Sequence, residues 1–114
     1  MCDELTFRLI VKAELAGWIV AHGCSNEWEF QKQSPAGEDF YFIIEAKDAE
    51  NVWYEVKKAA KQFDIYDHAE ARIRSEPECT GSDMEALVND AYDIQEMMED
   101  LAYDLREVTK DLAA

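Results

Sequence analysis

Residues 82–112 read SDMEALVNDAYDIQEMMEDLAYDLREVTKDL and contain neither proline nor glycine. Ser82 and Glu85 have the spacing of a capping box, which marks the start of a helix. After them, apolar residues recur at alternating spacings of three and four, the period of a helix with one buried side. The stretch therefore predicts a helix of about 31 residues, or about 46 Å. Its apolar residues, called the apolar seam below, are Met84, Leu87, Ala91, Ile94, Met98, Leu101, Leu105, Val108 and Leu112.

The heptad spacing of the apolar seam permits two interpretations, a coiled-coil dimer or a helix that packs on its own chain. With Met84 as position a, the g residues are mainly acidic and the e residues are neutral or apolar, so neither dimer orientation gains salt bridges. Val88 and Ala102 instead widen the seam, as is typical of a helix on a globular core. We therefore favour packing within the chain and expect a monomer or at most a weak dimer. The g residues are Asp90, Met97, Asp104 and Asp111, and the e residues are Val88, Gln95, Ala102 and Thr109.

The beginning of the chain favours a first helix over residues 3–22. Apolar residues recur there at spacings of three and four, and Gly23 suits the position just after a helix. A strand over residues 6–11 is the alternative, because apolar and polar residues alternate in part of that segment. The apolar residues of the predicted helix are Leu5, Leu9, Ala13, Ala16 and Val20.

The middle of the chain predicts a β-hairpin and two helices. Residues 27–46 alternate polar and apolar side chains around Ser34-Pro35-Ala36-Gly37, which is typical of two strands and a turn. Residues 48–63 favour a helix with Asp48 as its N-cap, residues 67–74 favour a short helix, and residues 75–81 favour a loop. The chain thus predicts one α+β domain over residues 1–114: an N-terminal helix, a β-hairpin, and helices ending in a long acidic C-terminal helix.

The composition is strongly acidic. The 26 acidic and 11 basic side chains give a formal net charge of −15, and residues 75–114 alone carry 12 acids and two bases. Because phosphate contacts need clustered Lys and Arg, direct binding of nucleic acid or an anionic membrane is excluded as the main activity. No stretch approaches the roughly 20 uncharged residues of a membrane span, and the three cysteines lack a disulfide-framework spacing. We therefore expect a cytoplasmic protein with reduced thiols.

Residues able to carry catalysis or bind a metal form no complete set. His22 and Cys24 flank a glycine, but no second pair completes a zinc site. Residues 64–75 hold some acids of a calcium loop, but Ala69 and Ser75 replace its glycine and its glutamate. Phosphate-binding loops, nucleophile elbows and metalloprotease motifs are absent from the sequence. We therefore predict a non-enzymatic protein without a cofactor or metal.

Acidic side chains recur on the predicted C-terminal helix opposite the apolar seam. Like charges at this spacing repel by about 0.2–0.5 kcal/mol per pair, so the arrangement costs stability. Its axial steps of about 4.5–6 Å compare with one charge per about 3.4 Å of a nucleic-acid strand, and the helix matches the length of about 13 or 14 base pairs. We interpret it as a surface for the basic groove of a nucleic-acid-binding protein, with a merely solvated face as the alternative. The acidic row comprises Asp93, Glu96, Asp100, Asp104, Glu107 and Asp111, with Tyr92, Glu99 and Tyr103 beside it.

The stretch LVNDAYDIQEMMEDLA, residues 87–102, resembles the ends of small uncharacterised proteins of bacterial mobile elements. The acidic chain as a whole resembles the DNA mimics of phages and mobile elements, among them anti-restriction and anti-CRISPR inhibitors. The resemblance implies a non-enzymatic inhibitor or regulator of a host-defence nuclease or similar protein. It implies no common fold, because DNA mimics share charge rather than fold. The alternative function is an adaptor or oligomerisation module that makes its contact through the apolar seam.

Overall fold

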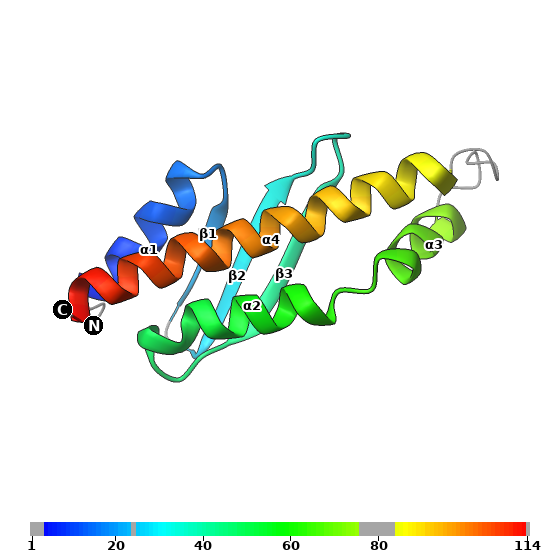
Figure 1. The fold of residues 1–114 in the computed structure, drawn as a ribbon. Helices are drawn as coiled ribbons and strands as arrows, with labels where there is room; N and C mark the ends of the chain where they lie inside the picture. Colours follow the sequence, from blue (N-terminus) through cyan, green and yellow to red (C-terminus); the bar gives the residue numbers. More distant parts are fainter. Residues whose placement is uncertain (1–3, 24, 76–83, 114) are drawn as a thin grey trace.

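The computed structural model describes residues 4–23, 25–75 and 84–113. For residues 112 and 113 it describes the backbone only. A three-stranded antiparallel sheet in the order β1-β2-β3 forms one layer. The long helix α4 crosses the sheet between α1 and α2, in a molecule of 50 × 25 × 22 Å (Figure 1). The predicted α+β fold is confirmed. The elements are α1 Glu4–Leu15, β1 Ile19–Ala21, β2 Glu27–Gln33, β3 Asp39–Glu45, the 3-10 helix η1 Ala49–Asn51, α2 Val52–Gln62, α3 Ile65–Ser75 and α4 Met84–Ala113.

The helix predicted over residues 82–112 is confirmed as α4, and its apolar seam is buried inside the chain. Ile94 and Leu105 are completely buried, because α4 contacts α1, α2 and α3. The seam therefore packs within the chain, as its flanking positions favoured. Ser82 of the predicted capping box and the side chain of Leu112 lie outside the described residues.

The first helix is correct in type but was predicted seven residues too long, and the alternative strand over residues 6–11 is wrong. Helix α1 ends at Leu15 because Gly17 has a positive φ of 96°, the left-handed conformation that glycine adopts readily. The Gly17 N–H donates to the Glu14 carbonyl and the Trp18 N–H to the Ala13 carbonyl, both at 3.0 Å. These two bonds form a Schellman motif, so Gly17 and not Gly23 follows the helix.

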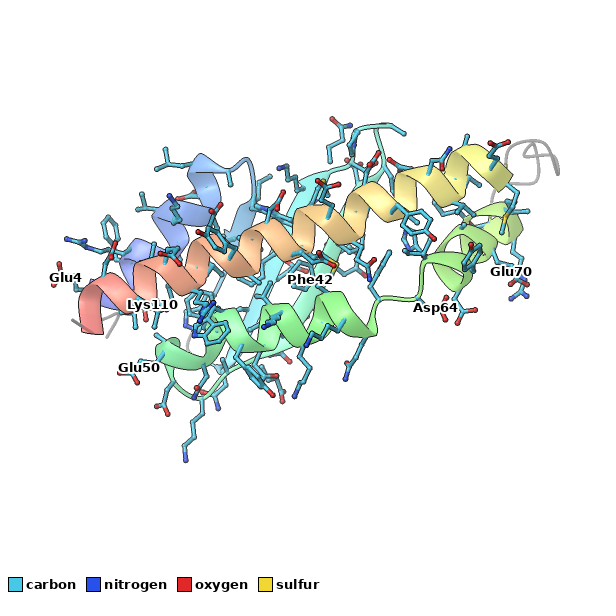
Figure 2. All side chains as sticks on the ribbon, viewed as in Figure 1. Glu4, Phe42, Glu50, Asp64, Glu70 and Lys110 are labelled. Carbon is cyan, nitrogen blue, oxygen red and sulfur yellow. The ribbon has the colours of Figure 1, made fainter. Side chains whose placement is uncertain are left out.

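The predicted hairpin is confirmed as β2 and β3, and a third strand joins it. At the turn, Gly37 has a φ of 97° and its N–H donates to the Ser34 carbonyl at 2.9 Å. Strand β1, which was predicted as helix, pairs with β2 through Ile19↔Gln31 and Ala21↔Glu29. Trp28 and Phe30 of β2 are buried toward the helices, and Phe42 of β3 lies beneath α4 (Figure 2).

The two middle helices are confirmed with shifted starts. Asp48 precedes η1 but makes no side-chain capping bond, and α2 begins at Val52. Helix α3 begins at Ile65 rather than at residue 67, because the Asp64 Oδ1 atom accepts a hydrogen bond from the Asp67 N–H at 2.9 Å. Of the predicted loop, Ser75 is the last residue of α3, and residues 76–81 lie outside the described ranges.

In the described ranges, no helix combines the length and the apolarity that crossing a bilayer requires.

Candidate protein-binding face

The acidic row and the residues beside it lie along α4 on the side away from the core. Asp104 and Glu107 are half-buried, and the other residues of the set are exposed. Burial of the apolar seam fixes this orientation, because the row lies roughly opposite it on the helical wheel. The structure therefore brings all nine predicted residues onto one helix. The exposed residues are Tyr92, Asp93, Glu96, Glu99, Asp100, Tyr103 and Asp111.

Basic side chains from neighbouring helices lie at both flanks of this face. On one flank, Lys57 and Lys61 of α2 line a groove together with Glu99. On the other, Arg8 and Lys12 of α1 lie around the depression that Asp111 lines. The C-terminal helix alone offers only Arg106 and Lys110, so sequence reasoning underestimated the positive charge near its two flanks.

The acidic row itself carries no ion pair within the described part of the chain. The ion pairs there join other residues, such as Glu4 with Arg8 and Glu55 with Lys58, each at 3.3 Å. Asp93, Glu96 and Asp100 form the N-terminal half of the row and are exposed. Their charge is therefore available to a partner.

Two exposed tyrosines accompany the acidic row. Tyr92 and Tyr103 are 50% and 62% exposed, although tyrosine commonly buries its ring. A hydrogen bond with Tyr66 of α3 is the main cause that raises the pKa of Tyr92 above its ordinary value. Tyr92 thus lies near Tyr66 of α3, while Tyr103 borders the groove next to α2.

Sequence reasoning missed a buried polar cluster where the β2–β3 turn meets α3 and α4. Asp90, which the heptad placed beside the apolar seam, is only 3% exposed. Its Oδ2 atom accepts a hydrogen bond from the Ser34 Oγ at 2.8 Å, and its Oδ1 atom accepts one from the Ala36 N–H at 3.2 Å. The Arg72 Nη1 atom lies 3.6 Å from the same Oδ2. This carboxylate therefore ties the β2–β3 turn and α3 to α4.

Glu38 connects the same cluster to α3. The Arg72 Nε atom lies 2.8 Å from Glu38 Oε1, and the His68 Nε2 atom lies 2.7 Å from Glu38 Oε2. His68 and Arg72 are four residues apart and share a face of α3, which was the sequence signal for a joint role. Their acidic partners are distant in the sequence: Glu38 precedes His68 by 30 residues and Arg72 by 34, and Asp90 follows Arg72 by 18. Residue spacing alone therefore did not indicate these contacts.

The described residues contain no group of three or more His, Cys, Asp or Glu side chains placed to hold a metal ion. His22 instead packs with its ring stacked on Trp28 at 4.0 Å between centroids, and its Nδ1 atom lies 2.8 Å from the Glu27 carbonyl oxygen. Cys24 and the other two cysteines, Cys2 and Cys79, lie outside the described ranges.

No protein-family model matches the chain, and neither does any curated protein or solved structure.

Proposed function

We propose that the exposed face of α4 binds the basic groove of a nucleic-acid-binding protein and occupies it in place of nucleic acid. The observation that carries this proposal is the exposed N-terminal half of the acidic row at Asp93, Glu96 and Asp100, which makes no ion pair with any described residue. A host-defence nuclease is the kind of partner that the resemblance to DNA mimics suggests. The proposed action is inhibition or regulation by occupancy, without chemistry on the partner.

The rigidity of α4 supports this function. From Asp93 to Asp111 the row spans about 27 Å at about 1.5 Å per residue, in steps of three or four residues. The buried side of the same helix is anchored by Ile94, Met98 and Leu101. The carboxylates are therefore held in a line before binding, which lowers the ordering cost of association. A line of like charge also attracts a basic groove over a distance and accelerates encounter.

The exposed tyrosines suit the margins of such an interface. Aromatic side chains are enriched at protein interfaces, since they bury much apolar area with little loss of conformational entropy. Tyr92 and Tyr103 are eleven residues apart, about three turns, and therefore share a side of α4. We expect them to supply contact area next to the charged contacts.

The adaptor alternative is not favoured, because the apolar seam is used inside the chain. Ile94 and Leu105 are completely buried and Leu101 is 1% exposed. A partner could reach them only if α4 separated from the core, which would expose a large part of the apolar surface that stabilises the fold.

The test begins by identifying the partner in a low-salt pull-down from the native host and measuring its association rate at two ionic strengths. We expect the variant Asp93→Asn, Glu96→Gln, Asp100→Asn, Asp104→Asn to associate more slowly than wild type and with a flatter salt dependence. We also expect DNA to compete with the wild-type protein for the partner. Because repulsion along α4 is relieved, the variant should be as stable as wild type or slightly more stable in urea unfolding.

The outer face of the sheet offers a control with the same change in charge. The variant Glu27→Gln, Glu29→Gln, Asp39→Asn, Glu45→Gln also removes four negative charges, but from β2 and β3. It should associate nearly as fast as wild type. If both variants slow association equally, overall charge and not the α4 face drives binding. If DNA and this protein bind the partner together, the proposed mimicry is wrong.

A further inference from the structure

A groove of about 310 Å³ lies between α2 and α4, and its charge is opposite to that of the molecule. Helix α2 contributes Trp53, Lys57 and Lys61, and α4 contributes Arg106 together with a single acid, Glu99. Three cations against one carboxylate give a local excess of positive charge in a chain whose formal net charge is −15. Lys57 and Lys61 lie on the side of α2 that faces α4, and Arg106 lies on α4 itself.

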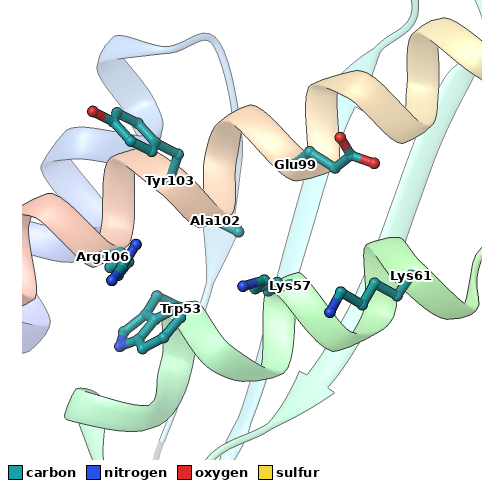
Figure 3. A pocket seen from close by; sticks show the side chains of 7 residues that line it. All are labelled: Trp53, Lys57, Lys61, Glu99, Ala102, Tyr103 and Arg106. Carbon is teal, nitrogen blue, oxygen red and sulfur yellow. The ribbon is translucent and has the colours of Figure 1, made fainter.

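The three cationic groups are spread along the space between the two helices, with Arg106 beside Trp53 at one end and Lys61 at the other (Figure 3). Figure 3 shows Lys57, Lys61 and Arg106 there, while Tyr103 extends from α4 away from α2. The Arg106 guanidinium carbon lies 5.4 Å from the centre of the Trp53 ring, close enough for a cation–π interaction. The groove thus combines an aromatic wall with a positively charged rim.

The groove cations are unpaired in the described part of the chain, although acids are abundant. The neighbouring Lys58, by contrast, lies 3.3 Å from the Glu55 carboxylate. Lys57 and Lys61 are four residues apart on one helix, a spacing at which like charges repel. An anion bound beside both lysines would reduce this repulsion and accept charge-assisted hydrogen bonds from their ammonium groups.

We propose that this groove binds a small organic anion. Its carboxylate or phosphate group would contact Lys57 and Lys61, and its aromatic or apolar body would lie toward Trp53 and Arg106. The volume is at the lower end of the roughly 300–1,000 Å³ of small-molecule sites, which suits a ligand with one ring. This site lies next to the acidic row and shares Glu99 and Tyr103 with the proposed partner-binding face, but it does not depend on the function proposed for that face.

Tryptophan fluorescence provides a local reporter. Trp18 and Trp28 are 3% and 2% exposed, whereas Trp53 is half-buried and lines the groove. We would titrate the protein at constant ionic strength with phenyl phosphate, benzoate and phenol. Phenyl phosphate, benzoate or both should change the emission saturably, and phenol should not, because it lacks the anionic group. The better of the two anions identifies phosphate or carboxylate as the favoured group.

Matched lysine variants assign the binding to the groove. The double variant Lys57→Ala, Lys61→Ala should weaken binding about tenfold or more, because it removes two charge-assisted contacts. Lys58→Ala, on the same helix but outside the groove, should leave the affinity unchanged. Glu99→Gln should strengthen binding by removing the only acid among the described residues that line the groove, and this gain cannot result from unfolding. Circular dichroism confirms that each variant is folded.

Three results would overturn the proposal. The first is the absence of a saturable change with either anion at millimolar concentration. The second is an equal loss of affinity in the Lys58→Ala variant. The third is binding of a poly-glutamate peptide without binding of either small anion, which would assign the groove to an acidic segment of another protein instead.

Discussion

At the scale of single residues, Gly17 decides where the first helix stops. Its φ of 96° is strained for any residue with a Cβ atom, and an added Cβ would lie 3.3 Å from the Lys32 Cε atom. We expect Gly17→Ala to lower the free energy of unfolding by about 1–2 kcal/mol. Gly37 has a similar φ, but an added Cβ there would meet no atom within 4 Å. Gly23 has no positive φ, and an added Cβ there would also meet no atom within 4 Å.

Urea unfolding of the three glycine variants separates strain from crowding. Gly37→Ala should lose somewhat less stability than Gly17→Ala, and Gly23→Ala should stay within about 0.5 kcal/mol of wild type. A Gly17→Ala protein as stable as the Gly23→Ala protein would show that the Schellman motif does not determine the end of α1.

Asp90 is the second residue whose role depends on tertiary structure. Its carboxylate accepts hydrogen bonds from Ser34 and Ala36 and lies near Arg72. Asp90→Ala should therefore lower the free energy of unfolding by about 3 kcal/mol, since it removes the acceptor of the Ser34 hydroxyl and the Ala36 N–H and one of the two acidic partners of Arg72, which keeps Glu38. Asp93→Ala, an exposed position without an ion pair in the described residues, serves as the control and should change stability by about 0.5 kcal/mol or less.

Chemical denaturation at neutral pH measures both aspartate variants. Asp90→Asn keeps an oxygen acceptor but loses the charge, so its stability should fall between that of wild type and Asp90→Ala. Equal stabilities of Asp90→Ala and Asp93→Ala would show that the cluster around Asp90 does not hold the turn and α3 to α4.

At the scale of elements, sequence periodicity predicted the parts whose signal is local. The uninterrupted spacing of α4 and the alternation in β2 and β3 repeat over several turns or residue pairs, so each identifies its element without tertiary information. Strand β1 has only three residues, and its apolar character continued the helical spacing of α1 beyond Gly17. Pairing with β2, and not the local sequence, makes that segment a strand.

The candidate site likewise contains some residues that the local sequence predicted and others that only the tertiary structure brings together. The acidic row follows from spacing on one helix, so the sequence predicted its residues together. The groove cations Lys57 and Lys61 come from α2, and the partners of Asp90 come from the β2–β3 turn and α3. Such contacts depend on how helices pack, and no residue spacing within α4 indicates them.

At the scale of the whole molecule, the charge is unevenly distributed. Helix α4 carries an exposed acidic face, and the groove beside it carries Lys57 and Lys61 of α2, which make no ion pair with any described residue. The acidic row and the groove lysines carry charges of opposite sign and therefore attract different ligands, although Glu99 and Tyr103 border both surfaces. Variants of Asp93, Glu96 and Asp100 can be combined with variants of Lys57 and Lys61, because none of these residues belongs to both surfaces.

The use of the apolar seam inside the chain leads to a prediction for the whole molecule. Since the seam buries Leu101 and Leu105 against α1, α2 and the sheet, we expect a monomer or at most a weak dimer by light scattering. Leu101→Asp or Leu105→Asp should unfold this monomer, because each places a charge in the core without a partner. Tyr103→Asp adds the same charge to the same helix at a site that is 62% exposed, and should remain folded. A tight dimer at sub-micromolar concentration that Leu101→Asp converts into a folded monomer would instead assign the seam to an interface between two chains.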